Sequence, residues 1–407
     1  MPLWTTPDTP PADRVRESHE RITGSSPVHI ADAPATWVLI GENVDYYGGV
    51  TIVGLTQLRA AVAFSSRDDD SVHVTFRTAE VDEAGGQHVR EVVGEASLAS
   101  INDAAPGLGT RYAGIVHNLI SRQMLSRETT GMDITVESDI PIGSGMGAMY
   151  AADVALALAL LADHEDINEA PLRTRIAELC SQAVDTYSTM PVLRARHTAA
   201  LRGVGETVSV VDYADGSVTQ APHPLRSGVD IFSVAKDLGE PDASQAELIA
   251  RRRKFIDAAT HNFGTESLRS IPDAPARVVE WLQAIHQVRG TDGTPTEEQA
   301  HDWMLFSENE TLRALAVAKA LRSRRQNDLF HLLNTPHDTH GLDTPNELVK
   351  LLNLRGARAA RPAAAGMSQA VVAFVPVPHT QNFVADLVDD GFYVLPVLQG
   401  EVARVVS

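Results

Sequence analysis

Three side chains that can accept hydrogen bonds lie close together near the start of the chain: Glu42, Asn43 and Asp45. They follow the apolar run 37–40, which has the length and boundaries of a buried strand that ends at Gly41. Carboxylate and amide oxygens at a strand end can accept hydrogen bonds from several hydroxyl groups at once. The spacing therefore indicates a binding site for a neutral polyol, with a solvated acidic loop as the alternative.

A second candidate site is the glycine-rich segment 141–147, between an expected strand at 132–137 and an expected helix that ends near residue 161. Such a segment can hold an anion, because free N–H groups and the helix dipole point at the ligand. A helix start that binds no ligand is the alternative. The candidate nucleotide-binding residues are Gly143, Ser144, Gly145 and Gly147.

Both segments resemble the galactokinase family of the GHMP kinase superfamily. The stretch from Ala33 to Gly49 reads A-P-A-T-W-V-L-I-G-E-N-V-D-Y-Y-G-G and is similar to the family's A-P-G-R-V-N-L-I-G-E-H-T-D-Y-N-G-G. The Glu, His and Asp of the family's loop hold the sugar, so the resemblance implies that Glu42, Asn43 and Asp45 do the same. Segment 141–147 is similar to the family's phosphate loop, which implies ATP and Mg²⁺ as cofactors.

Several family positions carry different residues in this chain. The family's arginine that assists phosphoryl transfer falls on Thr36, its catalytic aspartate on Arg196 and its metal-binding glutamate on Val184. Three serines of the family's phosphate loop fall on 147–149, which read G-A-M and offer no hydroxyl to phosphate or Mg²⁺. A guanidinium stays protonated and cannot act as a general base. The resemblance therefore implies a divergent member with degenerate motifs, no intact catalytic residue and no metal ligand.

The arginines of the chain carry two further expectations. We expect Arg196 to fold into the sugar pocket and pair with Glu42 or Asp45, because the planar guanidinium favours bidentate contact with a carboxylate. The run 251–253, R-R-R, resembles part of a family motif, but a solvated helix face is the favoured interpretation. Arg361 matches the third family motif.

Composition narrows the classes of partner. The chain has 407 residues and a net charge of −19, which repels nucleic acid and anionic lipid, so we expect neither nucleic acid nor a membrane as a partner. The single cysteine, Cys180, cannot form an intrachain disulfide, which fits a cytoplasmic location. We expect no signal peptide, and the longest apolar run is too short to span a bilayer.

The resemblance extends from about residue 30 to about residue 400 and implies an α+β fold, the two-domain GHMP kinase fold with a cleft between the domains. The chain is long enough for two cores. The expected divisions are an N-terminal arm at 1–27, an N-terminal domain at 28–205 that holds both loops, and a C-terminal domain at 206–407.

The leading hypothesis is a galactokinase-like protein that has lost catalysis and binds a small-molecule sugar as a regulatory relative. An alternative is a weakly active or altered-specificity ATP-dependent sugar kinase. A third is a scaffold that binds no ligand and depends on a protein partner. ATP and Mg²⁺ enter only through the family resemblance, and the replaced residues leave no cofactor certain.

Overall fold

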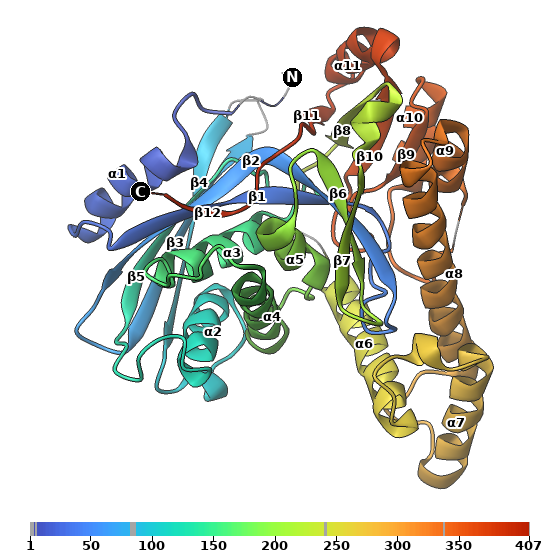
Figure 1. Cartoon of the computed structure of the whole chain (residues 1–407), viewed down its shortest axis with the longest axis horizontal. Helices are drawn as coiled ribbons and strands as arrows, with labels where there is room; N and C mark the ends of the chain where they lie inside the picture. The colour runs from blue at the N-terminus through green and yellow to red at the C-terminus, as the bar shows by residue number, and fades with distance from the viewer. Residues whose placement is uncertain (1–3, 5, 82–86, 240–241, 337, 407) are drawn as a thin grey trace.

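The structure is a computed structural model that describes residue 4 and residues 6–81, 87–239, 242–336 and 338–406. Figure 1 shows a sheet layered with helices on one side of the molecule and a column of long helices on the other. The last strand returns to lie beside the first strand of the chain. The mixed α+β architecture agrees with the fold expected from the sequence.

The larger sheet has eight strands in the order β12–β1–β2–β5–β3–β4, and the hairpin β6–β7 pairs with the first part of β2. Neighbouring strands are antiparallel except for β3 with β5. The strands of this sheet are β1 (His29–Ile40), β2 (Val50–Ser66), β3 (Ser71–Val81), β4 (Gln87–Ser97), β5 (Met132–Ser138), β6 (Thr207–Asp212), β7 (Ser217–Pro222) and β12 (Arg404–Val406).

Helices cover both faces of β1 and β2, which explains why these strands are almost uniformly buried. Successive residues of a strand point to opposite faces of the sheet. Ile30 and Ala61 pack against Val15 of the first helix, while other residues of β1 and β2 pack against α3. The helices around this sheet are α1 (Pro11–Thr23), α2 (Leu108–Ser121), α3 (Ala148–Leu160), α4 (Ala170–Tyr187) and α5 (Arg194–Arg202).

The second sheet has four antiparallel strands in the order β11–β8–β10–β9. Phe232 and Val234 of this sheet pack with Leu352 and Phe383, which come from the two helices that cover it. The elements of this part are β8 (Val229–Ala235), β9 (Ala359–Pro362), β10 (Val371–Pro376), β11 (Tyr393–Pro396), α10 (Asn346–Leu354) and α11 (Thr380–Asp389).

A lobe of helices, α6 to α9, reaches the loop after β1, residues 41–49, which we call the polar loop. Phe255, Leu282 and Trp303 share one core with Tyr47, which belongs to that loop. The polar loop is therefore anchored to the lobe by an aromatic side chain. The helices here are α6 (Ala243–Phe263), α7 (Ala274–Arg289), α8 (Glu297–Arg322) and α9 (Gln326–Asn334), and short 3₁₀ turns elsewhere are η1 (Ile101–Asp103), η2 (Pro224–Ser227), η3 (Leu268–Ser270) and η4 (Val377–His379).

The domain divisions expected from the sequence do not coincide with the division between the sheets. Strands β6, β7 and β12 lie past residue 205 but belong to the larger sheet. The second sheet begins only at Val229. The expected N-terminal arm is held against the larger sheet: Ser18 of α1 donates to Glu137 at 2.7 Å, and Arg14 pairs with Asp139 at 2.8 Å. Long-range strand pairing, which has no local sequence signature, accounts for these differences.

Within the described part of the chain, no helix combines the length and the apolar character that a membrane span requires.

Candidate functional site

The polar loop leaves β1 through a turn that only glycine can make. Gly41 has a φ of +90°, and a Cβ built on it would lie 2.1 Å from the carbonyl oxygen of Val50. The turn therefore requires a residue without a side chain. It brings Glu42, Asn43 and Asp45 to the same short loop, as the sequence predicts.

Three acceptor oxygens of this loop are buried and have no hydrogen-bond partner among the residues that the structure describes. They are Oε1 of Glu42, Oδ1 of Asn43 and Oδ2 of Asp45. Leaving a buried polar atom unpaired costs about 1–3 kcal/mol, and more for a charged group. Three such oxygens on one loop can accept hydrogen bonds from the donors of a ligand.

Glu42 lies in a low-dielectric environment. Its Oε2 accepts a hydrogen bond from the backbone N–H of Ala365 at 2.9 Å, and its Oε1 lies 4.0 Å from Nη2 of Arg196. Burial raises the pKa of Glu42 to about 7, although the charge of Arg196 acts in the opposite direction. Glu42 therefore changes its protonation state near neutral pH.

Asp45 pairs with Arg253, an arginine expected from the sequence to lie in solvent. Nη2 of Arg253 lies 3.5 Å from Oδ1 of Asp45, and both side chains are buried. Arg252 is also buried, so the interpretation of the run 251–253 as a solvated face is wrong for two of its three members. Three consecutive residues of a helix span about 200° of its circumference, so they cannot all share one face. Three consecutive positions therefore already indicated that not all of these arginines could face solvent.

Arg196 lies between the two candidate loops. Its Nη1 donates to the carbonyl oxygen and, at 3.2 Å, to Oγ1 of Thr36, and its Nη2 donates to the carbonyl oxygen of Gly145 at 2.8 Å. The expected bidentate pair with a carboxylate is wrong in its geometry. Arg196 lies within ion-pair distance of Glu42, but its hydrogen bonds go to Thr36 and Gly145, and Asp45 pairs with Arg253 instead.

The glycine-rich loop uses its own polar groups within the protein. Gly143, Gly145 and Gly147 all have positive φ angles, between 71° and 86°, and Gly147 immediately precedes α3. The hydroxyl of Ser144 is buried and donates to the carbonyl oxygen of Pro141 at 2.7 Å. The carbonyl oxygens of Gly143 and Gly145 accept from Ser368 and from Arg196.

A groove of about 80 Å³ lies along this loop and the start of α3. Tyr150 fills part of it, and its hydroxyl donates to the carbonyl oxygen of Pro191 at 2.5 Å. The guanidinium carbons of Arg111 and Arg196 lie 5.2 and 5.8 Å from the centre of the Tyr150 ring. The remaining lining is largely apolar and includes Met149, Met190, Leu193 and Met367.

The space beside the polar loop is smaller still. A cavity of about 10 Å³ lies between Glu42, Asp45, Arg196 and Tyr213, which is close to the volume that one water needs. A sugar is much larger than this cavity, so it could enter only if lining side chains such as Arg196 moved.

Asp153, near the start of α3, is held by two partners. Arg111 donates to both of its carboxylate oxygens, at 2.8 and 2.5 Å, and Nε2 of His197 lies 2.9 Å away. Burial disfavours ionisation of Asp153, but the charge of Arg111 and the bond to His197 keep its pKa below the usual range. Among the described residues, no group of three His, Cys, Asp or Glu side chains could hold a metal ion, and Val184 is buried in the core.

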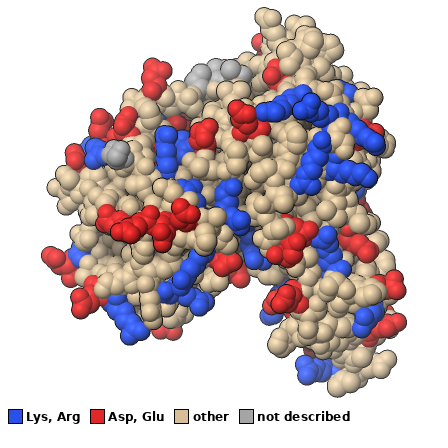
Figure 2. All heavy atoms as spheres, in the orientation of Figure 1, with Lys and Arg blue, Asp and Glu red and all other residues tan. Residues whose placement is uncertain are grey.

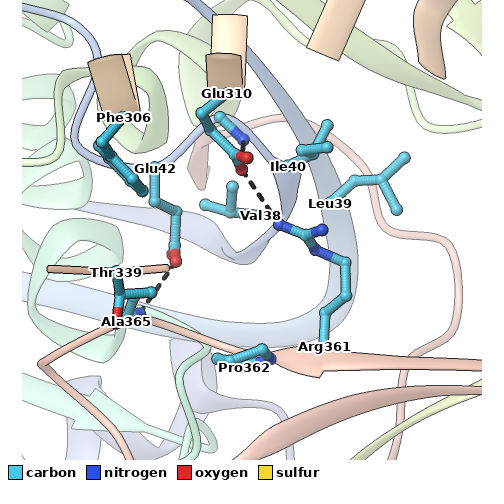
Figure 3. A pocket seen from close by; sticks show the side chains of 11 residues that line it. Val38, Leu39, Ile40, Glu42, Phe306, Glu310, Thr339, Arg361, Pro362 and Ala365 are labelled. Atoms are coloured by element: carbon cyan, nitrogen blue, oxygen red, sulfur yellow. Dashed lines mark hydrogen bonds and ion pairs between the residues drawn. The ribbon is translucent and has the colours of Figure 1, made fainter. Parts of the chain in front are cut away.

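Glu310 of α8 supports the polar loop from behind, and no sequence argument singled it out. Its Oε1 accepts from the backbone N–H of Gly41 at 3.1 Å and from Nη2 of Arg361 at 3.0 Å. Figure 3 shows Glu310 and Arg361 pointing toward each other beside Glu42.

Comparisons with known proteins agree with this arrangement. A model described as the galactokinase galactose-binding signature matches residues 17–66. The galactokinase of Streptomyces coelicolor is 25% identical over 265 residues, which cover 65% of this chain and 64% of that protein. The galactokinase of Mycobacterium tuberculosis is 27% identical over 366 residues, which cover 88% of this chain and 91% of that protein.

Solved structures show the same fold. The galactokinase of Lactococcus lactis complexed with galactose has a TM-score of 0.72 at 18% identity, over 96% of this chain and 99% of that chain. The L. major mevalonate kinase in complex with R-mevalonate has a TM-score of 0.55 at 13% identity, over 93% and 100% of the two chains.

A polar loop after β1, a glycine-rich loop before α3 and the two sheets together define the fold of the GHMP kinases. In sequence, the chain is similar to the galactokinases named above at 25–27% identity, and its residues 17–66 match the galactose-binding signature.

Proposed function

We propose that the protein binds galactose or a related sugar through the polar loop and does not catalyse phosphoryl transfer. The observation that carries the sugar site is the set of three buried, unpartnered acceptor oxygens on Glu42, Asn43 and Asp45. Sugar hydroxyls are neutral donors and would satisfy these acceptors without adding charge to the pocket. Displacement of Arg196 toward the glycine-rich loop would open the space that the sugar needs.

The loss of catalysis rests on the groups around Arg196. A general base typically contributes about 10²–10⁴-fold to a rate, and one electrostatic stabiliser about 10²–10³-fold. The family's base position carries a guanidinium that hydrogen-bonds to Thr36 and Gly145, and the family's arginine position carries Thr36 itself. A kinase rate of about 1–100 s⁻¹ would fall toward about 10⁻⁴ s⁻¹ with both contributions lost.

Mg²⁺ and ATP do not fit the residues at the glycine-rich loop. Mg²⁺ requires oxygen ligands, but Ala148 and Met149 offer none and the hydroxyl of Ser144 is committed to Pro141. Asp153, a carboxylate near the loop, is held by Arg111 and His197. We therefore assign no cofactor to the protein.

The proposed role is that of a cytoplasmic sugar sensor or regulatory relative, which would act through a protein partner. Isothermal titration calorimetry with galactose and with Mg-ATP tests it. We expect galactose to bind and Mg-ATP not to bind. Binding of neither ligand would overturn the sugar assignment.

Variants of the polar loop test which residues bind the sugar in this experiment. Glu42→Gln and Asp45→Asn each weaken a charge-assisted hydrogen bond, so we expect each to lower galactose affinity by about tenfold or more. Asp163→Asn is the control, because Asp163 is exposed and pairs only with His29 across the surface. Equal affinity of all three variants and the wild type would contradict the assignment of the loop.

A second candidate function is an altered sugar kinase that uses Glu42 as its base. A pKa of about 7 and an unpartnered Oε1 suit a general base that works at neutral pH. A coupled assay separates the candidates. Turnover of about 1 s⁻¹ on any sugar, the lower end of ordinary kinase rates, together with its loss in Glu42→Gln, would establish the kinase and exclude the sensor.

A further inference from the structure

A basic cavity lies outside the candidate sugar site. It has a volume of about 280 Å³ and lies between the turn η2, the end of α8 and the start of α9. It shares no lining residue with the cavities at the polar and glycine-rich loops. Its walls carry Arg226, Arg324 and Arg325, and its apolar floor includes Leu321 and Leu329.

The concentration of positive charge here is unusual for this chain, whose net charge is −19. From Thr311 to Asn327 the sequence contains no Asp or Glu, while the short stretch 319–325 reads K-A-L-R-S-R-R. In Figure 2 basic side chains gather on the upper right of the molecule, where Figure 1 places the end of α8 and α9. Clustered like charges in an acidic protein repel one another unless an anion neutralises them.

The arginines of the cavity are only partly neutralised by the protein. Arg226 pairs with the exposed Glu206 at 2.9 Å, and Arg325 lies 3.7 Å from the exposed Asp328. Exposed pairs of this kind are weak, worth about 0–1 kcal/mol. The guanidinium of Arg324 has no ion pair with the residues that the structure describes. Positive charge is therefore available to a ligand.

A buried imidazole adds a directed donor. His223 lines the cavity and is 1% exposed, and its Nδ1 accepts from the backbone N–H of Leu225 at 3.3 Å. Burial, with the charge of Arg226, lowers the pKa of His223 to about 4, so the ring is neutral and carries its proton on Nε2. Nε2 has no hydrogen-bond partner in the described part of the chain.

The start of α9 contributes further donors. The first N–H groups of a helix have no partner within the helix, and the helix dipole is positive at that end. Gln326, the first residue of α9, lines the cavity beside Arg325. Arginine side chains, a neutral imidazole N–H and a helix N-terminus are the donors that phosphate groups prefer.

We propose that this cavity binds a phosphate group, carried by inorganic phosphate or by the phosphate monoester of a small molecule. Cation-rich walls and an unpartnered Nε2–H would hold the phosphoryl oxygens, and the apolar floor would contact the rest of an ester. The ring of His223 also contacts Trp37, whose centroid lies 5.6 Å away and which follows Thr36 in the chain. The site is thus connected to the strand that carries the polar loop.

Calorimetry on the full chain tests the proposal, with inorganic phosphate and a hexose 1-phosphate as the two probes at constant ionic strength in chloride. We expect saturable binding to the wild type. The double variant Arg324→Ala/Arg325→Ala should lose about tenfold or more of the affinity, because each removes a charged donor. Both arginines are exposed, so this variant should remain folded.

Two further variants make the result specific. Arg322→Ala removes the same charge from the same helix end, but Arg322 does not line the cavity. The phosphate affinity of this variant should therefore stay within about twofold of the wild type, a smaller change than the loss of one hydrogen bond would cause. His223→Phe retains a ring beside Trp37 and removes the N–H, so it should weaken binding.

The two probes identify the source of the phosphate. Tighter binding of the hexose phosphate supports an ester ligand, and equal binding supports phosphate alone. No binding of either probe by the wild type at millimolar concentration, or equal loss of affinity in Arg322→Ala and in the double variant, would overturn the proposal. None of these variants alters the polar loop, so a failure here leaves the proposed sugar site untouched.

Discussion

The polar loop after β1 and the glycine-rich loop before α3 lie on either side of Arg196, but their polar atoms are in opposite states. In the polar loop three buried acceptors have no partner among the described residues. In the glycine-rich loop the hydroxyl of Ser144 and the carbonyls of Gly143 and Gly145 are engaged by other protein groups. The polar loop therefore keeps three acceptors for a ligand, whereas these acceptors and this hydroxyl of the glycine-rich loop are used within the fold.

Arg196 links the two loops. Arg196 donates to Gly145 on one side and lies 4.0 Å from Glu42 on the other. It therefore forms a hydrogen bond with the glycine-rich loop but leaves Oε1 of Glu42 without one among the described residues.

The strongest test concerns the glycine-rich side. Arg111→Met would leave the buried carboxylate of Asp153 without its main partner, so we expect the free energy of unfolding to fall by about 3–5 kcal/mol. Urea denaturation measures this. Arg67→Met is the matched control, because Arg67 forms more exposed ion pairs, with Asp69 and Asp133, and should cost about 1 kcal/mol or less. Similar losses in both variants would show that the buried network has no special structural role.

The pH dependence of stability tests the state of Glu42. Its pKa is raised from 4.5 to about 7, so the folded protein binds more protons than the unfolded chain between these values. The contribution of Glu42 to stability is therefore greatest below pH 4.5, decreases as the pH rises and is lost above about pH 7. The change is on the order of 3 kcal/mol.

Glu42→Gln removes this dependence. Urea denaturation at acidic and at mildly alkaline pH should show the variant gaining stability relative to the wild type at the higher pH. If the difference between variant and wild type is the same at both pH values, Glu42 does not titrate near neutrality and the second candidate function loses its support.

Substitutions at two glycines separate the effect of backbone strain from the effect of a steric clash. Gly41→Ala places a methyl group against the carbonyl of Val50 and forces alanine into a left-handed conformation, so we expect a loss of about 2 kcal/mol or more and loss of galactose binding. Gly24→Ala is the matched control, because Gly24 also has a positive φ but faces open space. It should cost about 1 kcal/mol, from strain alone. Thermal unfolding and calorimetry measure both effects.

The smallest effect is expected at Tyr150. Tyr150→Phe removes one hydrogen bond, to the carbonyl of Pro191, and should lower stability by about 1 kcal/mol. Galactose affinity should not change, because Tyr150 lies on the glycine-rich side of Arg196. A marked loss of affinity in this variant would show that the two loops act as one site.

Much of the local structure could be predicted from the sequence. The expected strand at 132–137 and the expected helix that follows segment 141–147 correspond to β5 and α3. The apolar run 37–40 forms the end of β1, although the strand begins eight residues earlier, at His29. These signals are local, since they depend on periodicity, glycine and the boundaries of apolar runs. Strand β12 has only three residues and carries no such signal, because its place is set by pairing with β1.

In the candidate site, too, some features follow from the local sequence and others depend on long-range contacts. Position along the chain is enough to place Glu42, Asn43 and Asp45 on one loop. Packing in three dimensions is what pairs Arg253 with Asp45, brings Glu310 to Gly41 and directs the hydrogen bonds of Arg196 to Thr36 and Gly145. These contacts join residues far apart in sequence, and the choice of partner depends on which side chains packing excludes from water.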